Sequence, residues 1–190
     1  MIKAIFLAAG QSKRLKYENK LIKRYKKAPL INHSLKVLHK SKVNKVIVVL
    51  GHQHKKVKKI ILKNKKNIFI YNKDYKKGMA SSIKVGLKKV ARNDKGFIVV
   101  QSDMPFIKKS DINKIYNSIK LKKFLVYVLK FKNKIGNPIG FDISLTKRFK
   151  KIKGEYGAKF MVKRLKNKTN FIKVNSSKVF KDFDLKKDFN

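Results

Sequence analysis

The residues with the clearest chemical potential lie at the beginning of the chain. A short apolar run at residues 5–7 is typical of a buried strand, and it ends in two alanines and a glycine at residues 8–10. Small residues let the main chain approach a ligand closely, and the cations Arg14 and Lys20 follow. Backbone N–H groups of such a turn bind phosphate oxygens, and cations offset the charge that develops as pyrophosphate leaves. The segment therefore predicts a nucleoside triphosphate site.

This segment matches neither of the two common phosphate-binding loops. A Walker loop requires G-x-x-x-x-G-K-[ST] and a dinucleotide loop requires G-x-G-x-x-G, whereas Gly10 has no second glycine at either spacing. The alternative interpretation is an ordinary turn after a strand, surrounded by solvated lysines.

A carboxylate follows a later apolar run in the same way. Residues 97–100 predict a buried strand, and Asp103 comes soon after it, with Pro105 stiffening the next turn. A carboxylate at the end of a strand is well placed to hold Mg²⁺. Acidic residues are rare here, ten against 52 lysines and arginines, so an aspartate at this position is more informative than in an average protein. The alternative is that Asp103 only caps the turn or the next helix.

A third polar group begins a predicted helix. Gly78 precedes Ser81 and Ser82, and hydroxyl groups with free N–H groups at a helix start suit a nucleotide base, ribose or phosphate. Ser82 is the better candidate, and Gly78 permits close approach of the ligand. A simple helix cap by one of the serines is the alternative.

The elements that must position these residues alternate between strands and helices. Strands are predicted at residues 5–7, 46–50, 68–71, 97–100 and 124–129, with helical apolar spacing at residues 31–38, 57–61, 79–90 and 112–119. This alternation indicates an α/β fold with a mostly parallel sheet, in which ligands bind beyond the carboxyl ends of the strands. In the less regular last third, turns are expected at residues 136–138 and 154–157, a helix at 160–165 and a strand at 171–174. One domain, residues 1–190, is expected.

The net charge of +42 raises the question of nucleic-acid binding. However, the lysines are spread along the chain, and only five residues are arginine, which base readout and bidentate phosphate contacts favour. The abundance of Ile, Asn, Phe and Tyr favours A+T-rich codon usage as the cause of the lysine excess. No specific nucleic-acid partner is therefore expected, although the surface should attract polyanions in a salt-dependent way.

Composition excludes further function classes. The chain has no cysteine, which rules out disulfides, thiolate metal sites and cysteine nucleophiles. No apolar run approaches the length of a membrane span, and the first residues lack a signal-peptide pattern. A cytoplasmic location without a membrane partner is therefore expected.

The motif L-A-A-G-Q-S-K-R at residues 7–14, followed by N-K-L at 19–21, resembles the opening of the molybdenum cofactor cytidylyltransferase-like nucleotidyltransferases. Later segments also match: G-M-A-S-S at 78–82, D-M-P at 103–105, G-N-P at 136–138, G-E-Y-G-A-K at 154–159 and D-F-D at 182–184. The resemblance implies a single Rossmann-like three-layer α/β domain of the nucleotide-diphospho-sugar transferase type.

The resemblance also implies roles for individual residues. Arg14, Lys20 and Asp103 are expected to be catalytic, and Asp103 and Asp184 to hold Mg²⁺; for Asp184, a cap in a solvated tail is the alternative. Relatives that use CTP carry L-A-A-G and those that use GTP carry L-A-G-G, so the second alanine implies CTP, with molybdopterin as the acceptor. The residues expected to bind the nucleotide are Leu7, Ala8, Ala9, Gly10, Arg14, Lys20, Gly78 and Ser82.

Two positions depart from the family pattern. Lys16 stands where the family usually has glycine, so either the loop has a different shape there or Lys16 adds a phosphate contact. Asn137 replaces a histidine of the segment that borders the acceptor side in the family. Asparagine keeps the hydrogen-bonding capacity of that position but cannot titrate.

The predicted reaction is transfer of CMP from CTP to a phosphorylated acceptor, with release of pyrophosphate. Guanylyl transfer, or a sugar or polyol phosphate as acceptor, is the alternative within this class. From another class, a basic nucleic-acid-binding protein is the alternative, because Tyr17, Tyr25 and Phe131 lie among lysines as base stacking requires. A partner protein that keeps the fold without the activity is a third possibility.

Overall fold

A seven-stranded sheet in the order β5-β4-β1-β6-β8-β7-β9 forms the centre of the protein, in a computed structural model that describes residues 1–12, 15, 18–154 and 157–189. Its neighbouring strands are parallel, except that β8 runs antiparallel to both β6 and β7. A separate hairpin pairs β2 (Arg24–Tyr25) with β3 (Ala28–Pro29). The strands of the large sheet are β1 (Ile2–Ala8), β4 (Lys45–Leu50), β5 (Asn67–Tyr71), β6 (Gly96–Gln101), β7 (Val126–Phe131), β8 (Lys134–Asp142) and β9 (Thr169–Lys173).

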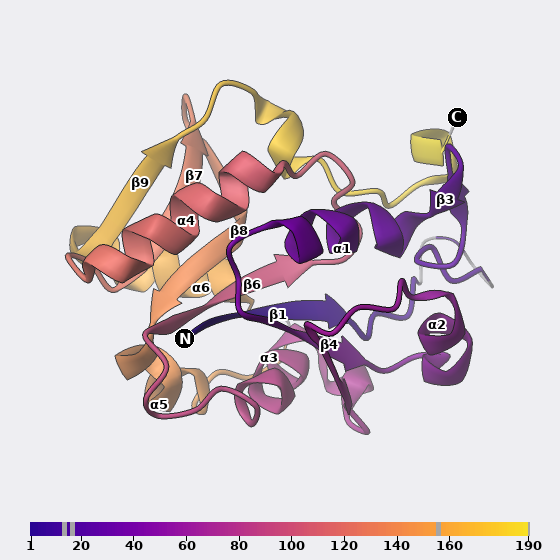
Figure 1. The fold of residues 1–190 in the computed structure, drawn as a ribbon, viewed down its shortest axis with the longest axis horizontal. Helices are drawn as coiled ribbons and strands as arrows, with labels where there is room; N and C mark the ends of the chain where they lie inside the picture. The colour runs from indigo at the N-terminus through magenta and orange to yellow at the C-terminus, as the bar shows by residue number, and fades with distance from the viewer. Residues whose placement is uncertain (13–14, 16–17, 155–156, 190) are drawn as a thin grey trace.

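Helices cover both faces of this sheet (Figure 1). Successive side chains of a strand point to opposite faces. Phe6 therefore belongs to a core cluster that includes residues of α1, α2 and α4, whereas Ile5 belongs to the cluster on the other face, which includes residues of α3, α5 and α6. Burial on both faces explains the continuous apolar runs of the central strands. The predicted three-layer α/β fold is therefore confirmed. The helices are α1 (Leu30–Lys40), α2 (His54–Ile60), α3 (Met79–Leu87), α4 (Lys109–Leu121), α5 (Thr146–Phe149) and α6 (Ala158–Arg164).

The predicted turn at residues 136–138 is wrong. Gly136, Asn137 and Pro138 lie inside β8, where the pairing with β7 shifts register between Val128 and Leu129. Glycine and proline favour turns locally, but proline is accepted in a strand at such an irregularity. Gly136 pairs with Leu129 of β7, and the strand continues at Ile139, which pairs with both β7 and β6. The other predicted strands and helices are present with somewhat different ends. Within the described residues, no helix combines the length and hydrophobicity that a bilayer crossing requires.

A buried ion pair joins the beginning of β1 to the turn before β6. The Lys3 ammonium lies 2.8 Å from an Asp94 carboxylate oxygen, and both side chains are almost fully shielded from solvent. Asp94 also accepts a hydrogen bond from the backbone N–H of Ala91 at 2.8 Å. Burial acts to raise the pKa of the Asp94 carboxyl, but Lys3 and the Ala91 N–H outweigh it, and the pKa lies below its ordinary value. The charged pair therefore stabilises the fold.

We expect Asp94→Asn to lower the free energy of unfolding by about 3 kcal/mol or more at neutral pH, because it leaves Lys3 buried without a counter-charge. A carboxyl whose pKa is depressed by folding contributes stability above its unfolded pKa of about 3.9 and loses it as the pH falls through the folded value. The difference between wild type and variant should therefore shrink below about pH 4. Urea unfolding at several pH values measures it.

The matched control is Asp74→Asn, which removes an ion pair with Lys77 that is largely exposed on both sides. It should change stability far less, because exposed pairs are screened by water. Equal effects of the two variants at neutral pH would contradict a stabilising role of the buried pair.

Candidate functional site

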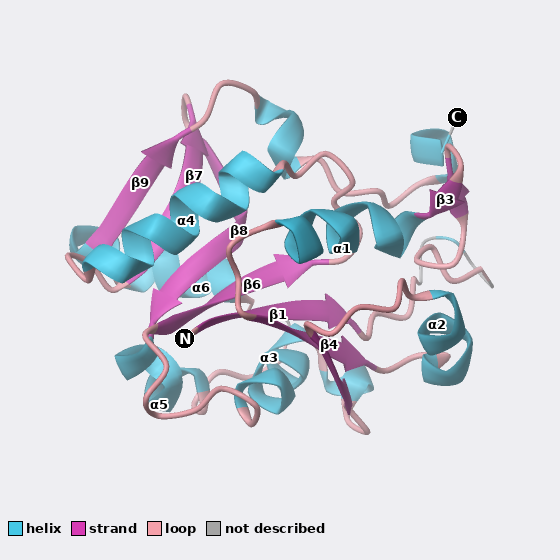
Figure 2. Cartoon of the chain, in the orientation of Figure 1, coloured by secondary structure: helices cyan, strands magenta, loops and turns pink. Residues whose placement is uncertain are grey.

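Most of the predicted site residues line one pocket. Figure 2 shows β1 and β6 pointing toward the same end of the molecule, where loops gather. The pocket at this end has a volume of about 430 Å³. The predicted residues that line it are Leu7, Ala9, Gly10, Lys20, Gly78, Ser82, Asp103 and Asp184.

Two residues predicted to bind the nucleotide are placed differently or are not described. Ala8 is fully buried in β1, where its side chain packs in the core and does not line the pocket. Arg14 lies outside the described residues, as does Lys16. At Gly10, an added Cβ would meet no atom of the described residues within 4 Å, so packing against those residues does not require a glycine here.

The centre of the pocket is a lysine held between two carboxylates. The Lys20 ammonium lies 2.6 Å from Asp103 Oδ2 and 2.7 Å from Asp184 Oδ1. Lys20 and Asp103 are mostly buried, and Asp184 is about one-third exposed. The sequence predicted Lys20 as a phosphate contact, but it did not predict this pairing with both aspartates.

Short hydrogen bonds fix the two turns that carry Lys20 and Asp103. The Ser12 hydroxyl accepts a hydrogen bond from the Lys20 backbone N–H at 3.1 Å, which draws the loop after β1 back on itself. The Ser102 hydroxyl donates to the Leu7 carbonyl at 2.7 Å. The ends of β1 and β6 are therefore joined beside the site.

Asp184 reaches the site because the C-terminal segment is anchored by Phe183. This side chain is 1% exposed, and its ring lies 4.7 Å from the ring of Tyr25 and 5.8 Å from that of Phe106. Its backbone N–H donates to the Asp103 carbonyl at 3.0 Å. Figure 1 shows the C-terminus beside β3, at the loop-rich end of the molecule. An aromatic cluster thus brings the last predicted aspartate to the pocket.

Burial and charge act against each other within this group. Burial acts to lower the pKa of the Lys20 ammonium, but Asp103 and Asp184 outweigh it and raise this pKa above its ordinary value. Burial raises the pKa of the Asp103 carboxyl, and Lys20 acts in the opposite direction without overcoming burial. Lys20 therefore carries its proton at neutral pH. Burial of the Asp103 carboxylate is unfavourable, and a bound cation would offset this desolvation.

The carboxylates of Asp103 and Asp184 suit a divalent cation that is also bound by a ligand. Asp103 Oδ1 is buried and has no hydrogen-bond partner among the described residues. Within the same residues, no group of three or more His, Asp or Glu side chains is arranged to hold a metal by itself. Mg²⁺ characteristically binds one or two carboxylates together with substrate phosphates and water. Asp103 with Asp184 matches that pattern better than a closed protein site.

The start of α3 forms a wall of the pocket. Gly78 has a positive φ of 93° and precedes the helix without a side-chain cap. Ser82 is buried, and its hydroxyl accepts a hydrogen bond from the Asn72 amide at 3.0 Å, while the Ser81 hydroxyl donates to the Gly78 carbonyl at 2.8 Å. Neither serine therefore caps the helix, and Ser82 is the one that lines the pocket.

Several lining residues were not predicted from the sequence. Tyr75 and Lys76 come from the short helical turn Tyr75–Lys77 between β5 and α3. Gln101 shortly precedes Asp103 in the sequence, and Asp182 shortly precedes Asp184. Lys76 could not be singled out by residue type, because lysine is abundant throughout the chain. The strand topology could have predicted Tyr75 and Lys76 as lining residues, since β5 is parallel to β1 and the loop after it opens at the same edge of the sheet.

Solved structures with the same fold include proteins with nucleotidyltransferase names. Rv0371c from Mycobacterium tuberculosis H37Rv superposes with a TM-score of 0.85 at 20% identity, covering 99% of this chain and 94% of that chain. Its complex with manganese superposes with a TM-score of 0.81 at 18% identity, covering 99% and 95%. The 4-diphosphocytidyl-2C-methyl-D-erythritol synthase of Anaerococcus prevotii gives 0.78 at 16% identity, covering 100% and 92%. At these identities the likeness establishes the fold.

Sequence comparison identifies both a distant relative and a family. The bifunctional protein GlmU of Clostridioides difficile is 29% identical over 140 residues, which is 73% of this chain but only 29% of that protein. The model of the MobA-like NTP transferase domain matches residues 4–169, a range that contains Lys20 and Asp103 but ends before Asp184. Membership supports nucleotidyltransferase activity. The chain belongs to the family of MobA-like NTP transferase domains.

Proposed function

We propose that the chain transfers a nucleoside monophosphate from a nucleoside triphosphate to a phosphorylated acceptor and releases pyrophosphate. The observation that carries this proposal is the contact of Lys20 with Asp103 and Asp184 in a pocket beside the small-residue turn after β1. Cations and free N–H groups suit a triphosphate, and paired carboxylates suit the divalent cation that accompanies it.

In the proposed reaction an acceptor phosphate oxygen attacks the α-phosphorus of the triphosphate. The new P–O bond forms while the bond to the bridging oxygen breaks, and its electron pair leaves with pyrophosphate. No protein nucleophile is required, so the chain contributes positioning and charge neutralisation. The turn at residues 9–12, Lys20 and Arg14 would hold the triphosphate, while Gly78 and Ser82 would line the nucleoside.

Asp103 and Asp184 are the proposed metal-binding residues. Bound Mg²⁺ would neutralise phosphate charge and stabilise the leaving pyrophosphate. The buried Oδ1 of Asp103, which has no hydrogen-bond partner in the described part of the chain, supports this role, and the manganese complex of Rv0371C supports the use of a divalent metal on this fold. The hydrogen bond from the Phe183 N–H to the Asp103 carbonyl would keep the Asp103 and Asp184 carboxylates close to each other.

CTP is the proposed nucleotide and molybdopterin the proposed acceptor, in the cytoplasm. The Ala9 side chain lines the pocket and packs against Gly51, where an added Cβ would come within 2.7 Å of it. The resemblance of L-A-A-G at residues 7–10 to the relatives that use CTP supports this nucleotide. A polyol phosphate is the alternative acceptor, supported by the name of the similar erythritol synthase.

We expect Asp103→Asn to lower turnover by at least about 100-fold, because it removes the charge that would hold the metal against the phosphates. Pyrophosphate release with CTP and a panel of phosphorylated acceptors measures it. Asp142→Asn is the control, since Asp142 caps the helical turn Ile143–Leu145 and does not line the pocket. Retention of near wild-type turnover by Asp103→Asn would overturn the proposed site.

We expect Lys20→Met to weaken triphosphate binding by at least about tenfold, because Asp103 and Asp184 then face the phosphates without the intervening cation. Lys23→Met is the matched control: Lys23 lies three residues further along the chain and pairs with Glu18, which is mostly exposed. Nucleotide titrations at elevated salt suppress the non-specific attraction of a +42 surface. An equal loss in both variants would show that Lys20 has no specific role.

We expect CTP to bind more tightly than GTP in the presence of Mg²⁺, with Asp103→Asn weakening CTP binding. Isothermal calorimetry at elevated salt measures both nucleotides on both proteins. A preference for GTP would contradict the assignment of CTP but leave nucleotidyl transfer in place. Absence of binding by either nucleotide, with salt-sensitive RNA binding instead, would favour the basic nucleic-acid-binding alternative.

A further inference from the structure

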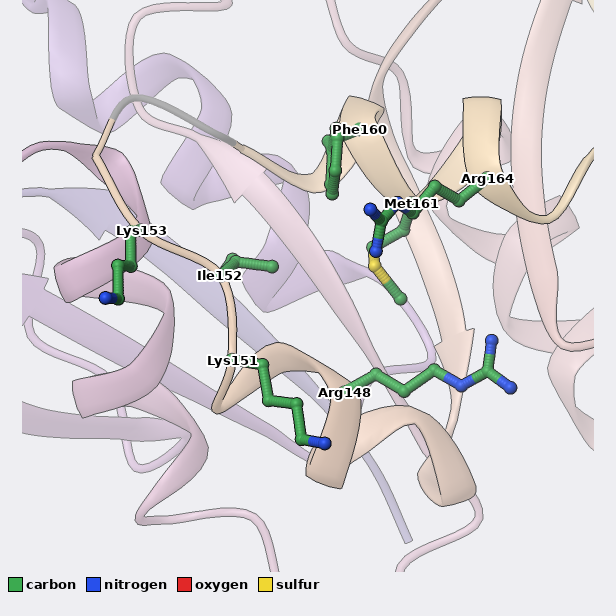
Figure 3. A pocket seen from close by; sticks show the side chains of 7 residues that line it. All are labelled: Arg148, Lys151, Ile152, Lys153, Phe160, Met161 and Arg164. Carbon is green, nitrogen blue, oxygen red and sulfur yellow. The ribbon is translucent and has the colours of Figure 1, made fainter.

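A second pocket lies between α5, the segment that follows it, and α6 (Figure 3). Its volume is about 470 Å³, and it shares no described lining residue with the nucleotide pocket. The residues that matter for its chemistry are Arg148, Lys151, Ile152, Phe160, Met161 and Arg164.

The basic residues around this pocket include more arginine than the composition of the chain would lead one to expect. Only five of the 52 basic residues in the chain are arginines, and two of them, Arg148 and Arg164, line this one pocket. A guanidinium offers a planar pair of donors to a phosphate or carboxylate, which an ammonium does not. Figure 3 shows Arg148 and Lys151 on the α5 side of the pocket and Arg164 on the α6 side, beside Phe160 and Met161, while Lys153 extends away from them.

The pocket combines this charge with an ordered apolar wall. Ile152 and Met161 are buried, and the Arg164 guanidinium lies 4.8 Å from the centre of the Phe160 ring, one helical turn earlier on α6. Stacking of this kind holds the guanidinium in place before a ligand arrives. Among the described residues, no carboxylate forms an ion pair with any of the three cations. The positive charge is therefore available to a ligand.

We propose that this pocket binds a small organic anion that carries a phosphate group on an apolar or aromatic body. The phosphate lies against Arg148, Lys151 and Arg164, and the body packs on Ile152 and Met161. Inorganic phosphate would leave the apolar wall uncovered, and a neutral apolar molecule would leave the cations without a partner. This chemistry distinguishes the pocket from the nucleotide site, whose centre carries two carboxylates.

Residues 151–154, which follow α5, contact both pockets. Residues 151–153 line the second pocket, while the Gly154 carbonyl accepts a hydrogen bond from the Ala80 backbone N–H at 3.0 Å. Ala80 lies in the first turn of α3, next to Gly78 and Met79 of the nucleotide pocket. The proposal for the second pocket does not depend on the proposed transferase activity. Because residues 151–154 contact both pockets, the experiment has to distinguish binding in the second pocket from binding in the nucleotide pocket.

The test is calorimetric binding of phenyl phosphate to the whole chain at elevated salt, without Mg²⁺. The double variant Arg148→Gln with Arg164→Gln should weaken binding by at least about tenfold, because two charge-assisted hydrogen bonds are lost. Lys147→Gln with Lys163→Gln is the matched control, since both lysines are exposed on the same two helices outside the pocket. It should leave the affinity unchanged, as should Asp103→Asn.

Inorganic phosphate and phenol, measured alone, should each bind at least about tenfold more weakly than phenyl phosphate. Equal weakening by the two double variants would overturn the proposal, because general surface charge would then explain the binding. Displacement of phenyl phosphate by CTP in simple competition would also overturn it, since the probe would then occupy the nucleotide pocket. Absence of phenyl phosphate binding would have the same consequence.

Discussion

The contact of the Lys20 ammonium with the Asp103 and Asp184 carboxylates joins three distant segments at the candidate site. Asp103 lies 83 residues from Lys20 in the sequence, and Asp184 lies 164 residues away. A buried carboxylate is costly without a counter-charge, so Lys20 allows both aspartates to approach the same point. The loop after β1, the end of β6 and the C-terminal segment therefore meet where an anionic ligand and its metal would bind.

The sheet makes this meeting possible. β1 lies between β4 and β6, and all three are parallel, so the loops that follow them open at one edge. The Ser102 hydroxyl joins the ends of β6 and β1 through the Leu7 carbonyl, and Phe183 fixes the final segment against Tyr25 and Phe106. Rigid strands thus determine where the charged side chains lie, and polar and aromatic contacts in the loops determine their orientation.

Charge alone cannot give this protein its selectivity. With a net charge of +42 the surface attracts anions in general, so a specific site needs more than lysines. In the candidate nucleotide pocket the additional feature is a pair of carboxylates, of which Asp103 has one oxygen without a partner among the described residues. In the pocket between α5 and α6 it is a pair of arginines beside apolar side chains. Each pocket is thus distinguished from the lysine-rich surface by other residue types, carboxylates in the first and arginines with apolar side chains in the second.

Local patterns in the sequence were enough to predict the alternation of strands and helices and the small-residue turn after β1, and to propose roles for Lys20 and Asp103, because periodicity and turn chemistry are local. They misassigned residues 136–138, which belong to β8 through the pairing of Gly136 with β7 and of the following residues with both β6 and β7. The fold was needed to show that Ala8 faces the core, that Tyr75 lines the pocket and that Lys20 contacts two aspartates. These outcomes depend on contacts between distant segments, which no local pattern encodes.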